Sequence, residues 1–384
     1  MRVLMVGPWQ MAAMRRQINW AVESGMDVLI ADTDRSGYLL LPPSVGHVAL
    51  YPGGADAIER AGLRKKSQRA AMISALRLRA AAERFRPHVI HSYRLDFYTD
   101  ICLRAGLSPL VVSVWGYMNH WLTGEVTRND WRWLRRLRRG AHTLLVENPN
   151  MRDILTEHRL GSLQAEYFPI GVDGKLFRPD NEDKAAAWRF ALGIPPEATV
   201  LLSPRGWSPT YGQQHVMAAF IDASRRLDIP LVLVLLGMGR MKQPERLAQE
   251  VHNLGVSQGF GHAIRWIPQV PHEDMPGVYA LADIVVNYPK GDAFPSTLLE
   301  AAACRRPVIT SALPAYRNTF IDRYCRLVEP ENPAALADAI VDVAGADRAL
   351  WAARAVEARK MVLAEYEEDL QKQRLMAVYN RIAR

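Results

Sequence analysis

Cysteine is scarce in this sequence of 384 residues. The three cysteines, Cys102, Cys304 and Cys325, do not have the spacing of metal ligands, and their odd number leaves a free thiol. A bound metal is therefore not expected. Free thiols are typical of a reducing compartment, which favours the cytoplasm over a disulfide-bonded extracellular fold.

Long hydrophobic runs are also missing. No stretch reaches the roughly 18 apolar residues that a membrane-spanning helix needs, and the apolar part of the N-terminus is too short for a signal peptide. The sequence contains no internal repeat or low-complexity tract. With 49% hydrophobic and 23% charged residues it has a globular composition, and its length predicts two domains of about 180 to 200 residues each.

The glycine pattern of a dinucleotide-binding loop is absent as well. An apolar run at 3–6 followed by Gly7, a helical pattern over 11–24 and a second apolar run at 28–31 predict a Rossmann-like start. Because the first loop lacks Gly-x-Gly-x-x-Gly, we expect no dinucleotide and no other cofactor.

The excess positive charge lies in the first part of the chain. The formal net charge is +8; residues 1–170 contain 23 Lys and Arg against 15 Asp and Glu, whereas residues 171–384 contain 25 of each. Basic residues recur in a helical pattern over 56–85, and arginine alternates with tryptophan over 130–140. Such helices can contact nucleic acid or a membrane, or present an ordinary solvated face. No nucleic-acid-binding motif is present, so nucleic acid is not an expected partner.

Residues 288–310 carry the clearest functional pattern. An apolar strand is followed by a loop containing Asp292, then by a helical Ser-Thr-Leu-Leu-Glu-Ala-Ala-Ala that contains Glu300 and is expected to begin with Ser296 as its N-cap. A carboxylate beside a helix N-terminus, at the carboxyl end of a parallel strand, is where doubly wound folds bind nucleotide-like ligands. The alternative is an ordinary crossover with solvated acids.

The same segment resembles the signature of glycosyltransferase family 4, acid-Gly-Phe-Pro-Asn-x-Leu-Leu-Glu-Ala-Met-Ala-Cys-Gly-x-Pro-Val-Ile. Residues 168–179 are similar to the family's segment between domains, Pro-x-Gly-Val-Asp-x-x-x-Phe-x-Pro. The resemblance implies a retaining GT-B glycosyltransferase with an α/β fold of two Rossmann-like domains facing a central cleft. Residues 1–170 would bind the acceptor and 171–384 the nucleotide sugar, with the last helix, about 365–384, packing back on the first domain.

The resemblance also implies roles for individual residues. Glu300 corresponds to the acid that binds the donor's ribose, Asp292 to the acid that contacts the sugar, and Arg205 to the cation that holds the diphosphate. Arg205 and Asp292 are the catalytic candidates. The family's second cation, a lysine, is replaced here by Thr210 or Tyr211. The further donor-binding candidates are Gly7, Gln269, Val270, Lys290, Ala293, Phe294, Ser296 and Thr297.

Three of these residues are donor-binding candidates for specific reasons. Lys290 is a candidate substitute for the missing lysine, with a plain surface lysine as the alternative. Gln269 and Val270 fall in a segment that is similar to the strand and turn lining the family's nucleobase pocket.

On the acceptor side the candidates are His91, Asn119 and His120; the alternative for both histidines is a core or loop position. The expected partners are a nucleotide sugar and an acceptor glycan or small molecule. A phosphorylated or lipid-linked acceptor would suit the basic first domain, with peripheral contact at the inner membrane face. The alternative function is a GT-B nucleotide-sugar-binding protein or epimerase without transferase activity.

Overall fold

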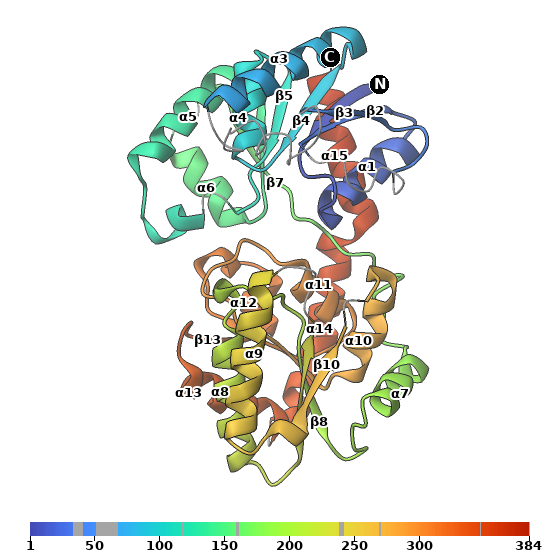
Figure 1. Cartoon of the computed structure of the whole chain (residues 1–384), viewed down its shortest axis with the longest axis vertical. Helices are drawn as coiled ribbons and strands as arrows, with labels where there is room; N and C mark the ends of the chain where they lie inside the picture. Colours follow the sequence, from blue (N-terminus) through green and yellow to red (C-terminus); the bar gives the residue numbers. More distant parts are fainter. Residues whose placement is uncertain are drawn as a thin grey trace. The chain divides into compact units, whose positions relative to one another are not determined.

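The structure is a computed structural model that describes residues 1–33, 41–50, 68–116, 119–158, 161–237, 242–268, 270–345 and 347–383. By its internal contacts the chain divides into two compact units (Figure 1). The first unit contains Met1–Ile170 and Leu370–Arg384, and the second contains Gly171–Asp369.

The first unit is built on a parallel sheet with the strand order β3-β2-β1-β4-β5-β6-β7. Most of its strands are short apolar runs buried on both faces, as is typical of parallel sheets covered by helices. The strands are β1 (Arg2–Val6), β2 (Asp27–Asp32), β3 (Gly46–Ala49), β4 (Val89–Tyr93), β5 (Leu110–Ser113), β6 (Thr143–Val146) and β7 (Gln164–Tyr167).

Helices cover both faces of this sheet, and alternate strand residues point to opposite faces. Leu4 and Ile90 belong to a core that includes residues of α3, α4 and α5, whereas Val3 and Val89 belong to a second core with residues of α1 and α15. The helices are α1 (Ala12–Glu23), α3 (Gln68–Phe85), α4 (Phe97–Arg104), η2 (Asn119–Thr123), α5 (Arg128–Gly140), α6 (Pro149–Glu157) and α15 (Glu368–Ile382).

The second unit has a parallel sheet with the order β10-β9-β8-β11-β12-β13. Its strands are β8 (Thr199–Ser203), β9 (Leu231–Leu236), β10 (Ile264–Ile267), β11 (Ile284–Asn287), β12 (Val308–Ser311) and β13 (Arg326–Val328). Its helices are α7 (Glu182–Ala191), α8 (Gln213–Arg226), α9 (Lys242–Ser257), α10 (Met275–Leu281), α11 (Ser296–Ala303), α12 (Phe320–Tyr324), α13 (Pro333–Ala344) and α14 (Arg348–Tyr366).

The predicted α/β class with two Rossmann-like units is confirmed, because both sheets are parallel and alternate with helices. Each sheet grows outward from a central strand in both directions. In the second unit the order reverses between β8 and β11, which makes the carboxyl ends of these two strands the topological switch point. None of the helices in the described part of the chain is long and apolar enough to cross a membrane.

The structure corrects the acceptor-side prediction for His91. This residue lies on β4 and is fully buried, and its ring nitrogens are 2.6 Å from the Tyr379 hydroxyl of α15 and 2.8 Å from the Ser113 hydroxyl of β5. Both ring nitrogens are therefore used to join a strand pair to the last helix. His91 is a core histidine and offers no surface to an acceptor.

Burial of His91 predicts a pH dependence of stability. Desolvation lowers the pKa of His91 from 6.5 to about 3, so the folded protein keeps this ring neutral at pH values where the unfolded chain protonates it. The stability that depends on the neutral His91 ring is fully present above pH 6.5 and is lost progressively as the pH falls from about 6.5 to 3. We expect His91 to lower the free energy of unfolding by about 1.4 kcal/mol between pH 7.5 and 5.5.

Urea denaturation of wild type and His91→Gln at the two pH values isolates this contribution from that of other groups. The expected result is a smaller decrease for the variant. An identical decrease for both proteins would contradict the assignment.

Candidate functional site

The loops that follow β8 and β11 bring two predicted residues together at the switch point of the second unit. Arg205 comes two residues after β8, and Asp292 lies between β11 and α11. Because β8 and β11 are hydrogen-bonded neighbours, their carboxyl ends lie side by side. The sequence separation of 87 residues between Arg205 and Asp292 is thus closed by sheet topology.

Arg205 and Asp292 form an ion pair. The guanidinium Nη2 lies 2.9 Å from Oδ2 of Asp292, and the two side chains are only 12% and 17% exposed. The guanidinium also lies over the Tyr211 ring, 3.9 Å from its centroid, and Nη1 is 3.5 Å from the Thr297 hydroxyl at the start of α11. Tyr211, one of the two residues that the resemblance offers at the position of the family's lysine, thus holds the Arg205 cation in place.

The environment of Asp292 acts in two directions on its acidity. Burial raises the pKa of the Asp292 carboxyl, and this effect exceeds the opposing effects of Arg205 and of the Ala293 amide, which donates a 2.9 Å hydrogen bond to Oδ1. A carboxylate whose charge is costly to bury depends strongly on its cationic partner.

The two loops are tied by their backbones. Lys290 donates its amide to the carbonyl of Thr210 at 2.9 Å, which joins the loop after β11 to the loop after β8. Within the segment after β8, Gln213 donates its side-chain amide to the carbonyl of Arg205 at 2.9 Å. Gly212 adopts a left-handed conformation, with φ of +65°, and a side chain there would collide with the carbonyl of Tyr288. A glycine is therefore required where the two loops approach each other.

Glu300 lies one turn inside α11 and is 6% exposed. Its Oε2 accepts a 2.7 Å hydrogen bond from the Tyr279 hydroxyl of α10, and its Oε1 is 3.3 Å from Nε2 of His272. Burial, together with the Glu300 charge, raises the pKa of Tyr279, so this hydroxyl stays protonated as a donor. The carboxylate is thereby fixed beside the half-exposed His272 ring.

Sequence reasoning missed Tyr279 and His272. The motif contains only residues of one segment, and nothing in the amino-acid sequence of α10 indicates that Tyr279 is a partner of Glu300. His272 offered a weak signal, because it lies two residues after Val270, which ends the segment that the resemblance places near the nucleobase.

The remaining donor-side candidates have different surroundings. Ala293 and Phe294 are buried residues of the loop between β11 and α11, while Ser296 and Thr297 are half-buried. The prediction that Ser296 caps α11 is wrong: Pro295 holds the N-cap position, Ser296 is the first helical residue, and no side chain caps the helix. The side chain of Lys290 is exposed, Val270 is half-buried, and Gln269 lies outside the described residues.

The other candidates in the first unit, Gly7, Asn119 and His120, make contacts within the fold. Gly7 donates its amide to Ala31 at 3.1 Å, and a side chain there would collide with Tyr93. Asn119 is half-buried and donates its amide to the carbonyl of Gly116 at 3.3 Å.

His120 is engaged with a buried carboxylate. Its Nε2 lies 2.8 Å from Oδ2 of Asp130, which forms the capping box of α5 with Thr127. Burial alone would raise the pKa of Asp130, but hydrogen bonds from Thr127 and His120 outweigh it and lower that pKa.

Polar groups are concentrated at the carboxyl edge of the second sheet. Among the described residues, the Asn287 side-chain amide, the Ser311 hydroxyl and Nε of Arg205 are buried without a hydrogen-bond partner. Asn287 ends β11 and Ser311 ends β12, the next strand. Unpaired polar groups are costly in a core and are typical of functional sites. They lie at the same edge as Arg205 and Asp292.

Residues 184–347 match the family model described as "Glycosyl transferases group 1". The chain is 30% identical over 174 residues to D-inositol 3-phosphate glycosyltransferase 1 of Catenulispora acidiphila, covering 44% of this chain and 41% of that protein. It is 28% identical over 212 residues to the D-inositol 3-phosphate glycosyltransferase of Nocardioides sp., covering 52% and 45%. These alignments span less than half the length of both relatives.

Solved structures resemble the chain over nearly its whole length. Sucrose-phosphate synthase from Thermosynechococcus elongatus superposes with a TM-score of 0.79 at 18% identity, covering 99% of this chain and 98% of that one. The Anabaena protein HepE, in complex with UDP and glucose, gives a TM-score of 0.77 at 16% identity, covering 99% and 100%. The predicted resemblance to a GT-B glycosyltransferase is confirmed: residues 184–347 match the glycosyl transferases group 1 model, and the chain has the two-unit fold of GT-B glycosyltransferases.

Proposed function

We propose that this protein is a glycosyltransferase that moves a sugar from a nucleotide-diphosphate sugar to an acceptor. The observation that carries the proposal is the grouping of Arg205 and Asp292, with Glu300 on the adjoining helix, at the switch point of a glycosyl transferases group 1 domain. The structural relative HepE has been solved with UDP and with UDP-glucose, which supports a nucleotide sugar as donor.

The three residues would divide the recognition of the donor. The Glu300 carboxylate, held by Tyr279, can accept hydrogen bonds from both ribose hydroxyls. The Arg205 guanidinium matches two oxygens of a diphosphate as well as it matches a carboxylate. An incoming diphosphate therefore competes with Asp292 for Arg205, and the displaced Asp292 carboxylate becomes available to the hydroxyls of the sugar.

The transfer step moves charge onto the diphosphate. The bond between the anomeric carbon and the phosphate oxygen breaks, and its electron pair goes to the diphosphate while the sugar becomes oxocarbenium-like. Arg205 stabilises that developing charge. An acceptor oxygen then bonds to the anomeric carbon and gives its proton to the departing phosphate oxygen. This path leads to retention and requires no protein nucleophile.

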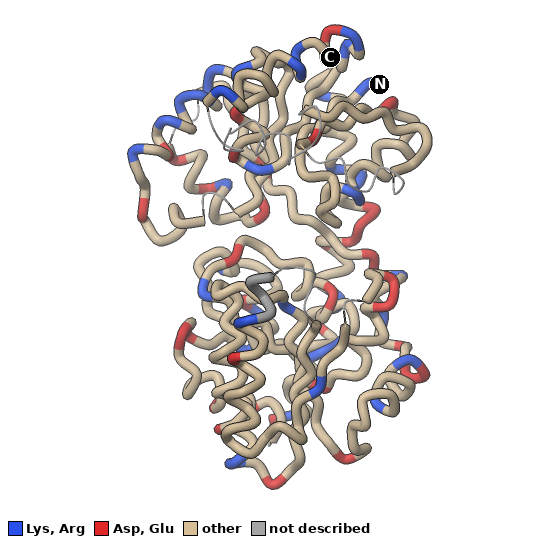
Figure 2. Tube along the Cα trace, in the orientation of Figure 1, with Lys and Arg blue, Asp and Glu red and all other residues tan. Residues whose placement is uncertain are grey.

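The acceptor is proposed to carry a phosphate. The two sequence relatives are named for D-inositol 3-phosphate, and residues 1–170, which make up most of the first unit, contain the whole excess of positive charge. Figure 2 shows Lys and Arg along α3 and α5 of that unit. On α3 the exposed apolar residues Met72, Ile73 and Leu76 accompany Arg69, which also suits a lipid-linked acceptor on an anionic membrane. The basic residues at 56–67 lie outside the described residues.

Contact with an anionic membrane can be tested separately. Sedimentation with anionic and neutral liposomes, at low and high salt, should show salt-sensitive binding to the anionic ones only. Equal sedimentation with both would remove the membrane from the proposal and leave a soluble acceptor.

A thermal-shift screen tests the donor. Uridine, guanosine and adenosine diphosphates and their sugars are added separately to the protein, and binding at about 100 times Kd stabilises it by about 2.7 kcal/mol. The selected donor is then assayed for release of the nucleoside diphosphate. Stabilisation without any release would favour the binding-only alternative, and no stabilisation by any nucleotide would overturn the proposal.

Tyr211 should support turnover through Arg205. Tyr211→Leu removes the ring beneath the guanidinium, an interaction of about 0.5 to 2 kcal/mol, so we expect kcat/KM for the donor to fall about 2- to 30-fold. Tyr211→Phe keeps the ring and should remain near wild type. Equal rates for the leucine variant and wild type would show that the stacking has no functional role.

A further inference from the structure

A cavity of about 740 Å³ lies in the first unit, and none of its lining residues belongs to the candidate site. Arg104 ends α4, Arg138 and Arg139 lie in the last turn of α5, and His142 immediately precedes β6. The cavity therefore opens at the amino ends of β5 and β6. Catalytic and nucleotide sites of doubly wound units lie at the opposite, carboxyl edge.

The lining of this cavity is strongly cationic. Four arginines contribute to it, Arg104, Arg136, Arg138 and Arg139, together with His142, and none of the described residues that line it is acidic. Asp100 forms ion pairs with two of these arginines, Arg104 and Arg136. Several cations around one hollow repel one another, and an anion would relieve that repulsion.

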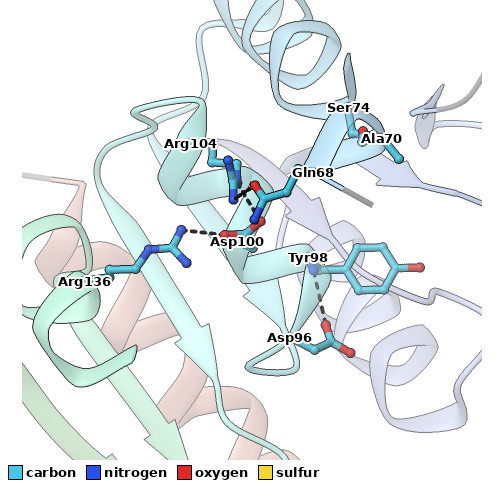
Figure 3. A network of polar contacts seen from close by, with 8 residues as sticks. All are labelled: Gln68, Ala70, Ser74, Asp96, Tyr98, Asp100, Arg104 and Arg136. Carbon is cyan, nitrogen blue, oxygen red and sulfur yellow. Dashed lines mark hydrogen bonds and ion pairs between the residues drawn. The ribbon is translucent and has the colours of Figure 1, made fainter. Parts of the chain in front are cut away.

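Two of the four arginines, Arg104 and Arg136, are held in position by neighbouring side chains (Figure 3). Arg104 donates from Nε to Asp100 at 2.7 Å and from Nη2 to the Gln68 side chain at 2.9 Å. Arg136 donates to the other oxygen of Asp100 at 2.5 Å and lies over the Trp133 ring, 5.0 Å from its centroid. A ligand would meet cations that have already lost much of their side-chain freedom, which favours binding.

The remaining wall also has a defined shape. A side chain at Gly140 would collide with Leu103, so the glycine lets the end of α5 approach the end of α4. His142 accepts the Leu110 amide at Nδ1, 3.3 Å away, which orients its ring. Cations near a helix C-terminus offset the helix dipole, as Arg104 does at the end of α4 and Arg138 and Arg139 do at the end of α5. The cavity brings these two basic helix ends together, which the dipole of either helix alone does not explain.

We propose that this cavity is a binding site for a phosphate-bearing ligand. Arginine forks match phosphate oxygens in pairs, Ser108 and Ser162 place hydroxyls on the lining, and Leu103 and Leu107 provide apolar wall for the rest of the ligand. The volume suits a small phosphorylated molecule or a lipid headgroup rather than a single ion. The site is independent of the proposed transferase activity.

Two matched double variants of α5 test the site. Arg138→Gln with Arg139→Gln removes two cations from the cavity, whereas Arg132→Gln with Arg135→Gln removes two exposed cations of the same helix that do not line it. Inorganic pyrophosphate is titrated calorimetrically into the full chain at constant ionic strength. We expect Kd to rise about tenfold or more in the cavity variant and to stay within about twofold of wild type in the control.

The donor site also attracts phosphate, so Arg205→Ala is titrated in parallel. Pyrophosphate binding that this variant retains and the cavity variant loses supports the proposal. Flotation with phosphatidic acid vesicles and with phosphatidylserine vesicles of equal charge identifies the source. If wild type and the control variant prefer phosphatidic acid vesicles and the cavity variant does not, the ligand is a lipid headgroup. If the cavity variant differs from the control variant only in its affinity for pyrophosphate, the ligand is a soluble molecule. If neither probe distinguishes the cavity variant from the control variant, the proposal is overturned.

Discussion

Arg205→Ala is expected to lower turnover about 10²- to 10³-fold, the loss observed when one transition-state donor is removed. The effect should be at least this large because Arg205 is the cation that contacts Asp292 and Tyr211 among the described residues, and the family's lysine is absent from the segment around Tyr211. The measured quantity is kcat with the donor selected by the nucleotide screen. Arg205→Lys keeps the charge but loses the bidentate fork, so its rate should lie between those of wild type and alanine.

The Arg205–Asp292 ion pair also predicts how the stability of Arg205→Ala depends on pH. Without Arg205, the mostly buried Asp292 carboxylate loses its cationic partner, and its pKa should rise further. The stability that Arg205→Ala loses relative to wild type should therefore be larger at pH 7.5 than at pH 5, where Asp292 is more easily protonated. Adding Asp292→Asn should restore stability at pH 7.5 without restoring turnover. Recovery of turnover in the double variant would show that Arg205 acts only as a counter-ion.

Most of the fold could be predicted from the sequence because its elements are local. Apolar runs such as Val3–Val6 and Leu231–Leu236, each followed by a glycine, identify buried parallel strands, and the intervening periodic segments identify the helices. The capping error at Ser296 has a local cause too. Pro295 already supplies an extended residue before the helix, so α11 begins at Ser296, one residue earlier than it would with Ser296 as its N-cap.

The internal arrangement of the site could not be predicted, because it depends on contacts between distant segments. Resemblance identified Arg205, Asp292 and Glu300 one by one, but their partners are set by the fold: Arg205 pairs with Asp292, and Glu300 with Tyr279. His91 illustrates the same limit. A histidine on a strand can face a ligand or a core, and only the packing of α15 puts the Tyr379 hydroxyl against it.

Replacing Glu300 should weaken nucleotide binding while leaving the fold intact. Glu300→Gln keeps the side-chain shape and can still accept the Tyr279 hydroxyl, but it loses the charge that strengthens hydrogen bonds to ribose. Loss of a charge-assisted hydrogen bond costs about 1.5 to 3 kcal/mol, or about 10- to 150-fold in Kd for the nucleoside diphosphate that the screen selects. Glu273→Gln, an exposed acid beside His272, removes the same charge and should bind normally.

The 2′-deoxy form of the same nucleotide separates ribose recognition from a general charge effect. Wild type should bind the deoxy nucleotide more weakly than the ribonucleotide, because a carboxylate that accepts two hydroxyls loses one of them. In Glu300→Gln the two nucleotides should bind more nearly alike, since the weakened acceptor gains less from the second hydroxyl. This comparison cancels differences in folding and net charge, because both ligands meet the same protein. If the deoxy nucleotide is disfavoured by the same factor in wild type and in Glu300→Gln, Glu300 does not bind the ribose, and His272 becomes the next residue to substitute.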